Sequence, residues 1–145
     1  MNRSCSVILS RSIVFLLLSC ASFAAADEPV DSRQLNLSLL EAARAGDAAA
    51  VERLLQKGAS VKARNRTGAT PLIQAARGGH TQIVRTLLGA GADVDQANLE
   101  RATPLLEATR NGHLETATAL IQGGADVNRI DRQLLSPLMH AVYGG

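Results

Sequence analysis

The chain repeats one short segment at a spacing of 33 residues. The segment GATPLIQAARGGH occupies positions 68–80, RATPLLEATRNGH occupies 101–113, and LLSPLMHAVYGG begins a further copy at 134. Alanine keeps this spacing at Ala42, Ala75, Ala108 and Ala141, and glycine keeps it at Gly46, Gly79, Gly112 and Gly145. A period of this length predicts a stack of similar units, each of which buries its apolar face against its neighbours.

Each unit is predicted to contain two short helices. Thr70 is suited to cap the first helix, and Pro71 to its first turn, where a backbone N–H is not needed. Gly79 permits the left-handed conformation that ends this helix, and His80 and Thr81 should then open a second helix, which Gly91 stops. The residues expected in these structural roles are Thr70, Pro71, Ala75, Gly79, Gly91, Thr103, Pro104, Ala108, Gly112, Gly124 and Pro137.

The segments TPLIQAA and GGHTQIVRTLLGAGADVD resemble ankyrin repeats, which share this period and a Thr-Pro-Leu-His-x-Ala pattern. The resemblance implies an all-α solenoid of stacked helix-turn-helix units with hairpin-like loops. The units are expected at 35–65, 66–98 and 99–131, with a partial unit at 132–145, after a short linker at 27–34. The last copy stops where its second helix would begin, which predicts that the native stack continues past Gly145.

Three departures from the ankyrin pattern affect the expected packing. The histidine that follows Thr-Pro-Leu in the ankyrin pattern is replaced by Ile73, Leu106 and Met139. The hydrogen bonds that this histidine would make between repeats are therefore not expected. Gly68 becomes Arg101 and Leu134 in later copies, which puts the tight loop geometry there in doubt. Thr116 and Ala117 stand where the preceding copy has Ile83 and Val84, so the third unit should be the softest complete one.

Residues 1–26 have the composition of a secretory signal peptide. Arg3 and Arg11 precede or flank an apolar run that begins at Ile13 and is too short to span a bilayer. Cleavage is expected after Ala24 or Ala26, with the latter preferred. An alternative is a lipoprotein signal cut before Cys20, because Leu-Leu-Ser-Cys resembles a lipobox, and the mature chain would then carry a lipid anchor.

The remaining composition disfavours several functions. Both cysteines, Cys5 and Cys20, fall in this N-terminal segment, so no disulfide or thiolate site is expected in the mature chain. From Asp27 onward there are 13 Lys and Arg against 13 Asp and Glu, and Tyr143 is the sole aromatic residue. Without a positive field or stacking side chains, nucleic-acid binding is not expected. A transmembrane span in the mature chain is not expected either.

The candidate polar residues do not form a catalytic or metal site. His80 and His113 are one repeat apart, too far to bind one metal ion if helices pack at about 8 to 10 Å, and a hydrogen bond at a helix start is expected instead. Turn formation explains Asp93, Asp95 and Asp126 better than acid–base chemistry. We therefore expect no enzyme activity, no metal and no cofactor.

The ankyrin resemblance implies a concave partner-binding face made of loop tips and first helices. The matching tip positions are Arg66, Thr67, Ala69, Leu99, Glu100, Ala102, Arg132, Gln133 and Leu135. On the first helices, one equivalent position holds Arg44, Arg77, Arg110 and then Tyr143. Such a row of arginines would suit an acidic protein segment, since guanidinium groups pair with carboxylates. The alternative is that the arginines only solvate the helix surface.

These features predict a non-enzymatic protein-protein interaction module with an unnamed protein partner. With its expected signal peptide and its size, the chain resembles exported ankyrin-repeat proteins of Gram-negative bacteria. This resemblance implies that the protein is located in the periplasm. Two alternatives remain open: an envelope lipoprotein acylated at Cys20 with a structural role, or the binding appendage of a longer protein whose catalytic part lies outside this chain.

Overall fold

A computed structural model describes residues 31–144, which form seven α-helices and no strand. The helices are α2 (Ser32–Ala45), α3 (Ala48–Gln56), α4 (Pro71–Arg77), α5 (Thr81–Gly89), α6 (Pro104–Arg110), α7 (Leu114–Gln122) and α8 (Pro137–Tyr143). The predicted all-α fold is confirmed. None of these helices is long and apolar enough to cross a membrane.

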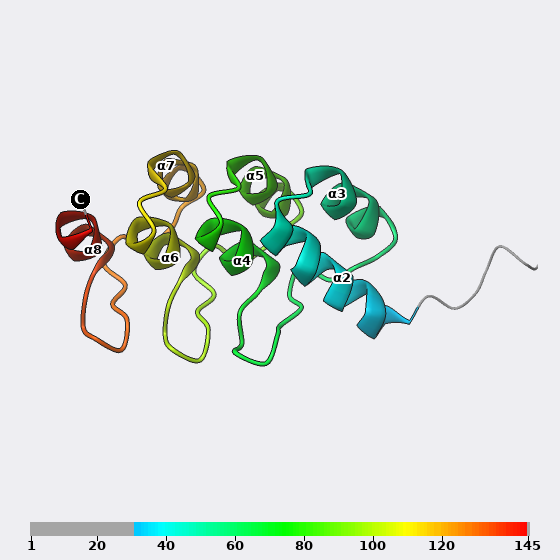
Figure 1. The fold of residues 1–145 in the computed structure, drawn as a ribbon, viewed down its shortest axis with the longest axis horizontal. Coiled ribbons are helices and arrows are strands. Elements are labelled where there is room, and N and C mark those ends of the chain that lie inside the picture. Colours follow the sequence, from blue (N-terminus) through cyan, green and yellow to red (C-terminus); the bar gives the residue numbers. More distant parts are fainter. Residues whose placement is uncertain (1–30, 145) are drawn as a thin grey trace, which may run out of the picture. The chain divides into compact units, whose positions relative to one another are not determined.

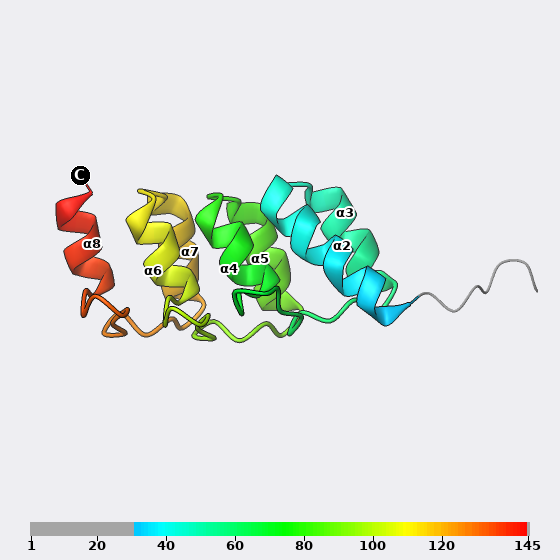
Figure 2. The same cartoon turned by 60° about the horizontal axis from the view of Figure 1, so that its bottom comes forward.

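The helices are arranged in two layers. Helices α2, α4, α6 and α8 lie side by side in one layer, while α3, α5 and α7 form the other, and the long loops all project to the same side (Figures 1 and 2). Each first helix contacts the next one along the chain, as α2 contacts α4 and α4 contacts α6. The second helices also contact one another in order. This is the stacked solenoid that the 33-residue period predicts.

The first helices of the later units begin as the sequence predicts. The hydroxyls of Thr70, Thr103 and Ser136 accept hydrogen bonds from the backbone N–H three residues later, at 3.3, 3.3 and 3.4 Å. A proline follows each of them and fills the first helical position. Helix α4 then ends at Arg77, and Gly79 turns the chain with a φ of +72°. In each of these three later units, one Ser/Thr-Pro pair therefore sets where the first helix starts.

Helix α2 is longer than the other first helices. Its N-cap is Asp31, whose side chain accepts a hydrogen bond from the N–H of Arg33, and the helix begins at Ser32. The three residues 32–34, expected in the linker, are therefore helical. The first unit has Leu37 and Ser38 where later units have Thr and Pro, so no proline fixes a later helix start.

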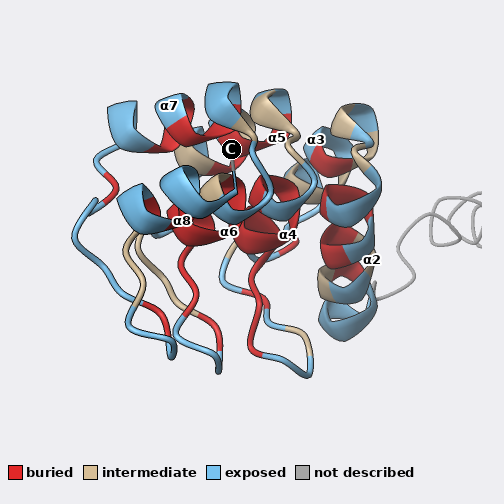
Figure 3. Cartoon of the chain, turned by 60° about the vertical axis from the view of Figure 1, so that its left-hand side comes forward, coloured by how far each residue is buried: buried red, intermediate tan, exposed pale blue. Residues whose placement is uncertain are grey.

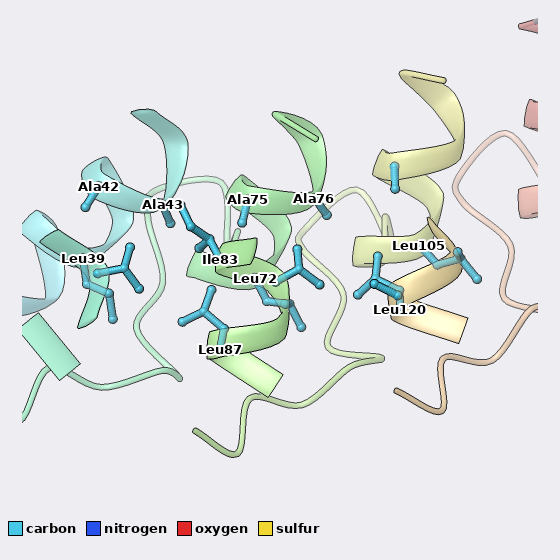
Figure 4. Close-up of a cluster of buried hydrophobic side chains, with 14 of the residues drawn as sticks. Leu39, Ala42, Ala43, Leu72, Ala75, Ala76, Ile83, Leu87, Leu105 and Leu120 are labelled. Atoms are coloured by element: carbon cyan, nitrogen blue, oxygen red, sulfur yellow. The ribbon is translucent and has the colours of Figure 1, made fainter. Parts of the chain in front are cut away.

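The core is built from aliphatic side chains at equivalent positions of successive units. Leu39, Leu72 and Leu105 have exposed fractions of 0, 0 and 1%. Side chains of the second helices, such as Ile83 and Leu120, pack into the same cluster (Figure 4). Replacing a buried leucine of this kind by alanine typically costs about 2 to 5 kcal/mol. Packing of aliphatic residues, repeated along the stack, holds these units together.

Helix α8 presents its apolar face to solvent. Leu138 occupies the position of the buried leucines just described, yet it is 73% exposed. Val142 and Tyr143 are also exposed, at 71 and 80%, and much of α8 is exposed in Figure 3. Within residues 31–144, no second helix of its own unit covers α8. The apolar character of this face follows from the repeat pattern, and it is exposed because no later helix among the described residues packs against it.

Candidate partner-binding surface

One side chain at an equivalent position closes each of the three loops. Asn65, Asn98 and Asp131 each use one side-chain oxygen to accept backbone N–H groups two and four residues later. These distances are 2.9 Å in the first two loops and 2.8 and 3.1 Å in the third. Asparagine and aspartate favour such turns because their short side chains mimic a backbone acceptor. The loop tips are therefore held by hydrogen bonds of their own.

The later loops keep their tight geometry without glycine. Arg101 and Leu134 both have a φ of +63°, close to the +75° of Gly68. The closing bonds also persist, from Asn98 N to Ala102 O and from Asp131 N to Leu135 O, at 3.0 and 3.1 Å. The doubt about the loop geometry is thus resolved: the tight loop is kept, and the backbone adopts a strained conformation at both positions. A bond at 3.1 Å from the N–H of Leu99 to the carbonyl of Thr67 joins the first two loops.

The structure divides the predicted tip residues into exposed and buried groups. The exposed side chains are those of Arg66, Thr67, Leu99, Glu100, Arg132 and Gln133. Ala69 and Ala102 are 0% exposed, so the prediction that they face a partner is wrong. They lie at the base of each loop, against the start of the following helix, and Leu135 is partly buried in the same position. A partner approaching the loops would meet the six polar and apolar tip side chains.

Arg77 in the arginine row already has a carboxylate partner. Its guanidinium donates two hydrogen bonds to Glu107 of the next unit, at 3.1 and 3.0 Å. Glu107 is 2% exposed, whereas the side chain of Arg77 is 46% exposed. The hydrogen bond to Glu107 raises the pKa of Arg77 above its ordinary value, although burial alone would lower it. This bidentate pair joins the second unit to the third.

Arg110 is paired in a second, three-residue cluster. It donates to Asp131 at 2.9 Å, and His140 Nε2 lies 2.8 Å from the same carboxylate oxygen. Burial alone would raise the pKa of Asp131, but the hydrogen bonds from His140, from two backbone N–H groups and from Arg110 bring that pKa below its ordinary value. An ionised carboxylate only accepts, so Nε2 of His140 must carry the hydrogen. The cluster joins α6, the third loop and α8.

Arg44 differs from the other two arginines because its neighbour position is neutral. Glu107 accepts from the arginine 30 residues before it, and the equivalent residue for Arg44 is Gln74. Within residues 31–144, no carboxylate lies within 4.0 Å of the Arg44 guanidinium. At the far end of the row, Tyr143 is 80% exposed. The predicted row is thus present in sequence, but its members have different surroundings.

The sequence interpretation did not identify Glu107, Asp131 and His140 as the partners of these arginines and of one another. A signal for them exists in the repeat register. Position 107 aligns with Gln74 and His140, and position 131 aligns with Asn65 and Asn98. At the first of these positions, the neutral Gln74 becomes the charged Glu107 in the next unit, on the helix beside the one that carries Arg77. Such a change next to an arginine would have indicated an ion pair. The arginines alone did not reveal how much of their charge is neutralised inside the chain.

The two aligned histidines bind between repeats instead of capping their own helices. Neither His80 nor His113 makes a side-chain cap hydrogen bond. Their Nε2 atoms lie 3.3 and 3.0 Å from the carbonyl oxygens of Arg44 and Arg77 in the preceding unit. Because a carbonyl oxygen only accepts, each ring nitrogen is the donor. The expected helix-start bond is therefore wrong, and histidine does bond between repeats, from a different position than the ankyrin pattern suggests.

The aspartates at the ends of the second helices make turn contacts. Asp93 accepts the N–H of Asp95 at 3.0 Å, and Asp95 in turn accepts the N–H of Asp126 from the next unit at 2.9 Å. In the described part of the chain, no group of three or more His, Cys, Asp or Glu is placed to hold a metal ion. The predicted turn role is confirmed for Asp93 and for Asp126, which accepts the N–H of Asn128 at 2.9 Å, whereas Asp95 joins two units. Cys20 and the predicted signal segment lie outside the described residues.

Comparison with known proteins identifies the repeat. A family model described as ankyrin repeats (3 copies) matches residues 10–98, 39–131 and 90–145. Together these matches cover more than half of the chain. No curated protein matches it.

Proposed function

Because the chain belongs to the ankyrin-repeat family, whose repeats are generic protein-interaction modules, we propose that it is a non-enzymatic module that binds a protein partner. The partner is held against the loop tips and the ends of the first helices. The loops point to one side of the stack (Figure 1), so one partner surface can contact several of them at once. Fold alone does not identify the partner.

The observation that carries this proposal is the combination of fixed loop backbones and exposed loop side chains. Asn65, Asn98 and Asp131 fix the loops by hydrogen bonds, while Leu99 is 63% exposed at a tip. A preformed surface binds more tightly because less conformational entropy is lost on association. Arginine, present at two of the tips as Arg66 and Arg132, is also a residue type enriched at protein interfaces.

The paired arginines contribute less to partner binding than the free ones. Arg77 and Arg110 already contact Glu107 and Asp131, so an incoming carboxylate would have to compete with a partner inside the chain. An acidic partner would therefore be recognised by cations outside these pairs, such as Arg66 and Arg132 at the tips.

The test is affinity capture of partners with a tip variant. The full chain would be tagged and used to retain proteins from the native cell envelope, followed by quantitative mass spectrometry. We expect Arg66→Glu, Leu99→Ser and Arg132→Glu together to lower the retained partner at least tenfold, because each changes an exposed tip. Unchanged circular dichroism would show that the variant is folded.

A matched control changes the opposite surface by a similar amount. Arg53→Glu, Arg85→Glu and Ile121→Ser replace exposed residues on the second helices α3, α5 and α7. This control should retain the partner as well as the wild type does. Equal loss in both variants, or no loss in the tip variant, would contradict binding at the tips.

Export to the periplasm is part of the same proposal and has its own test. It is supported by the N-terminal pattern of Arg3 and Arg11 with an apolar run, followed by Ala24 and Ala26. Cell fractionation should find a shortened chain outside the cytoplasm. Incorporation of radioactive palmitate that is lost on Cys20→Ser would instead indicate the lipoprotein alternative, whereas an uncut cytoplasmic chain would contradict export.

A further inference from the structure

The described chain is electrically asymmetric along the stack. Residues 31–79 contain eight Lys and Arg against four Asp and Glu, whereas residues 80–144 contain five against seven. Two of the acidic residues in the first part, Asp31 and Asp47, accept backbone N–H groups at the starts of α2 and α3. The positive end of the stack is therefore the end that carries α2, and it attracts anionic groups from solution.

A groove lies at this positive end, between α2 and the first loop. Its lining residues are Arg33, Asn36, Leu37, Leu40, Ala63 and Arg64, and its volume is about 310 Å³. We call it the Arg33–Arg64 groove. Leucine and alanine side chains supply its apolar lining, and Leu37 remains 47% exposed. A volume at the low end of the usual small-molecule range suits one or two side chains of a peptide.

The walls of the Arg33–Arg64 groove are fixed to each other. Asn36 Oδ1 on α2 accepts the N–H of Ser60 at 2.8 Å, across 24 residues of sequence. The following turn is closed by a bond from the N–H of Ala63 to the carbonyl of Ser60 at 3.0 Å. The groove is thus preformed, which lowers the entropic cost of binding.

Arg64 also lines a second groove, farther along the stack. That groove is about 360 Å³ and includes Val61, Lys62 and Asp93 among its lining residues. Asp93 is the acidic residue of this wall, and one of its oxygens accepts the N–H of Asp95. Arg64 therefore stands between two adjoining grooves that together offer three cations: Arg33, Lys62 and Arg64.

The cations of these grooves have no ion-pair partner inside the described chain. Within residues 31–144, no carboxylate lies within 4.0 Å of Arg33, Lys62 or Arg64, in contrast to Arg77 and Arg110. The later units also lack this charge, because the positions of Lys62 and Arg64 are occupied there by Asp95, Ala97, Asn128 and Ile130. The feature belongs to the first unit alone and is not a general property of the repeat.

We propose that the Arg33–Arg64 groove binds an extended acidic segment of the protein partner, with one aliphatic side chain between carboxylates. The aliphatic side chain packs against Leu37 and Leu40, and the flanking carboxylates pair with Arg33 and Arg64. A further carboxylate along the segment reaches Lys62 in the second groove. This inference rests on the proposed protein-binding function and adds the site and the chemistry of the bound segment. Arginine suits this role because its planar donors match a carboxylate.

The test uses a defined peptide and the full chain. A fluorescein-labelled peptide of sequence Glu-Asp-Leu-Asp-Glu-Asp is titrated with the protein, and fluorescence anisotropy gives the Kd. The neutral counterpart Gln-Asn-Leu-Asn-Gln-Asn should bind at least tenfold more weakly. Amide shifts in ¹⁵N spectra on adding the acidic peptide should map to residues 33–40 and 60–64. Shifts confined to other residues would contradict the assignment.

Matched variants separate this groove from a general effect of net charge. Arg33→Glu with Arg64→Glu should raise the Kd of the acidic peptide at least tenfold, and both residues are exposed, so the fold should persist. Arg53→Glu with Arg85→Glu makes the same change of charge on α3 and α5 and should leave the Kd within about threefold. Leu37→Ser should raise the Kd severalfold by removing apolar contact. Equal losses in the two double variants would overturn the proposal.

Other anions provide the remaining outcomes. Inorganic phosphate and phosphatidylglycerol vesicles are tested against the same residues, since guanidinium groups also bind phosphate. Binding of either one at residues 33–64 without binding of the acidic peptide would overturn the proposal. If peptide binding fails while the tip variant still loses its captured partner, the groove assignment falls and the proposed function stands. If partner capture alone fails, the proposed function falls.

Discussion

His113 Nε2 lies 3.0 Å from the carbonyl oxygen of Arg77, at the end of the preceding unit's first helix. The ring lies directly over Gly79, where an added Cβ would be 2.6 Å from Nδ1. The same arrangement joins His80 to Gly46, with a Cβ distance of 2.6 Å. Glycine at these turns therefore serves two purposes: it permits a positive φ, and it leaves room for the histidine of the next unit.

Gly79→Ala should destabilise the protein more than Gly112→Ala. The two glycines have nearly equal φ values of +72 and +71°, but nothing lies within 4 Å of a Cβ at Gly112. The loss of stability in Gly112→Ala should therefore reflect only the cost of the left-handed backbone conformation for alanine, about 1 to 2 kcal/mol. Gly79→Ala adds the contact with His113 and should cost at least about 1 kcal/mol more. Urea denaturation followed by circular dichroism gives both free energies of unfolding.

His113→Ala provides the control for this comparison. Alone, it should cost about 1 kcal/mol, the usual net value of one hydrogen bond. In a Gly79→Ala background it should cost less, because the crowded ring is then removed. Strictly additive free energies in the double variant would argue against direct contact between these residues.

Arg101→Gly and Leu134→Gly should not destabilise the protein, and each should raise its free energy of unfolding by up to about 1 kcal/mol. Both positions have a φ of +63°. This backbone conformation is unfavourable for a residue with a Cβ atom but not for glycine. Gly68→Ala should do the opposite, because its Cβ would lie 3.1 Å from Leu99 Cγ and 3.2 Å from Leu99 N. Thermal unfolding of the three variants checks the signs. A loss of stability in Leu134→Gly comparable with that of Gly68→Ala would contradict the strain argument.

Asp131→Asn should lower the free energy of unfolding at neutral pH. It should also make this free energy change less as the pH falls. The pKa of Asp131 is lower in the folded chain than the ordinary value of 3.8, so the folded state favours the ionised form. This contribution is present above that ordinary value and is lost as the pH falls through it toward the lower folded pKa. At pH 7 the substitution should cost about 1 to 2 kcal/mol, since bonds to Arg110 and His140 are weakened. The difference from wild type should shrink below about pH 4.

Asp126→Asn is the matched control for this pH experiment. It removes one carboxylate from an exposed turn, where asparagine can still accept the N–H of Asn128. Urea titrations between about pH 2 and 8 should give curves for this variant that run close to wild type. If Asp131→Asn were equally close to wild type at every pH, the cluster with Arg110 and His140 would have no energetic role.

Amide hydrogens of α7 should exchange faster than those of α5. The buried face of α5 has Ile83 and Val84, where α7 has the smaller Thr116 and Ala117. Less apolar area is buried there, although the hydroxyls of Thr81 and Thr116 lie 2.9 Å apart and are bonded to each other. Hydrogen exchange with mass spectrometry resolves the two helices. Equal protection would show that the hydroxyl pair offsets the lost packing.

The fold could be predicted because its signals are local and repeated. Thr70 and Pro71 indicate where a helix begins, and Gly79 indicates where it ends. The recurrence of this pattern every 33 residues indicates that the units stack. The start of α2 could not be placed so well. It has no proline, and Asp31 caps it six residues before Leu37, the position that aligns with the later caps.

The surface chemistry was less predictable because it depends on pairs from different units. Arg77 was identified as an exposed arginine, but its contact with Glu107 joins residues 30 positions apart. The same limit applies to His113, whose acceptor is a backbone carbonyl with no sequence signature of its own. The strained loops at Arg101 and Leu134 could not be foreseen either, because hydrogen bonds from neighbouring residues impose the positive φ.

Each of the two histidine bonds runs from one unit to the unit before it, so a whole repeat is the smallest segment that can be added without breaking this pattern. Residues 66–98 contain both halves of the junction: His80 bonds back to Arg44, and the carbonyl of Arg77 receives His113. A copy of this unit inserted in register would therefore bring a complete donor and acceptor with it. Gene duplication in whole multiples of the repeat would lengthen the protein without requiring a new junction, whereas a shift of a few codons would leave each ring facing the wrong turn.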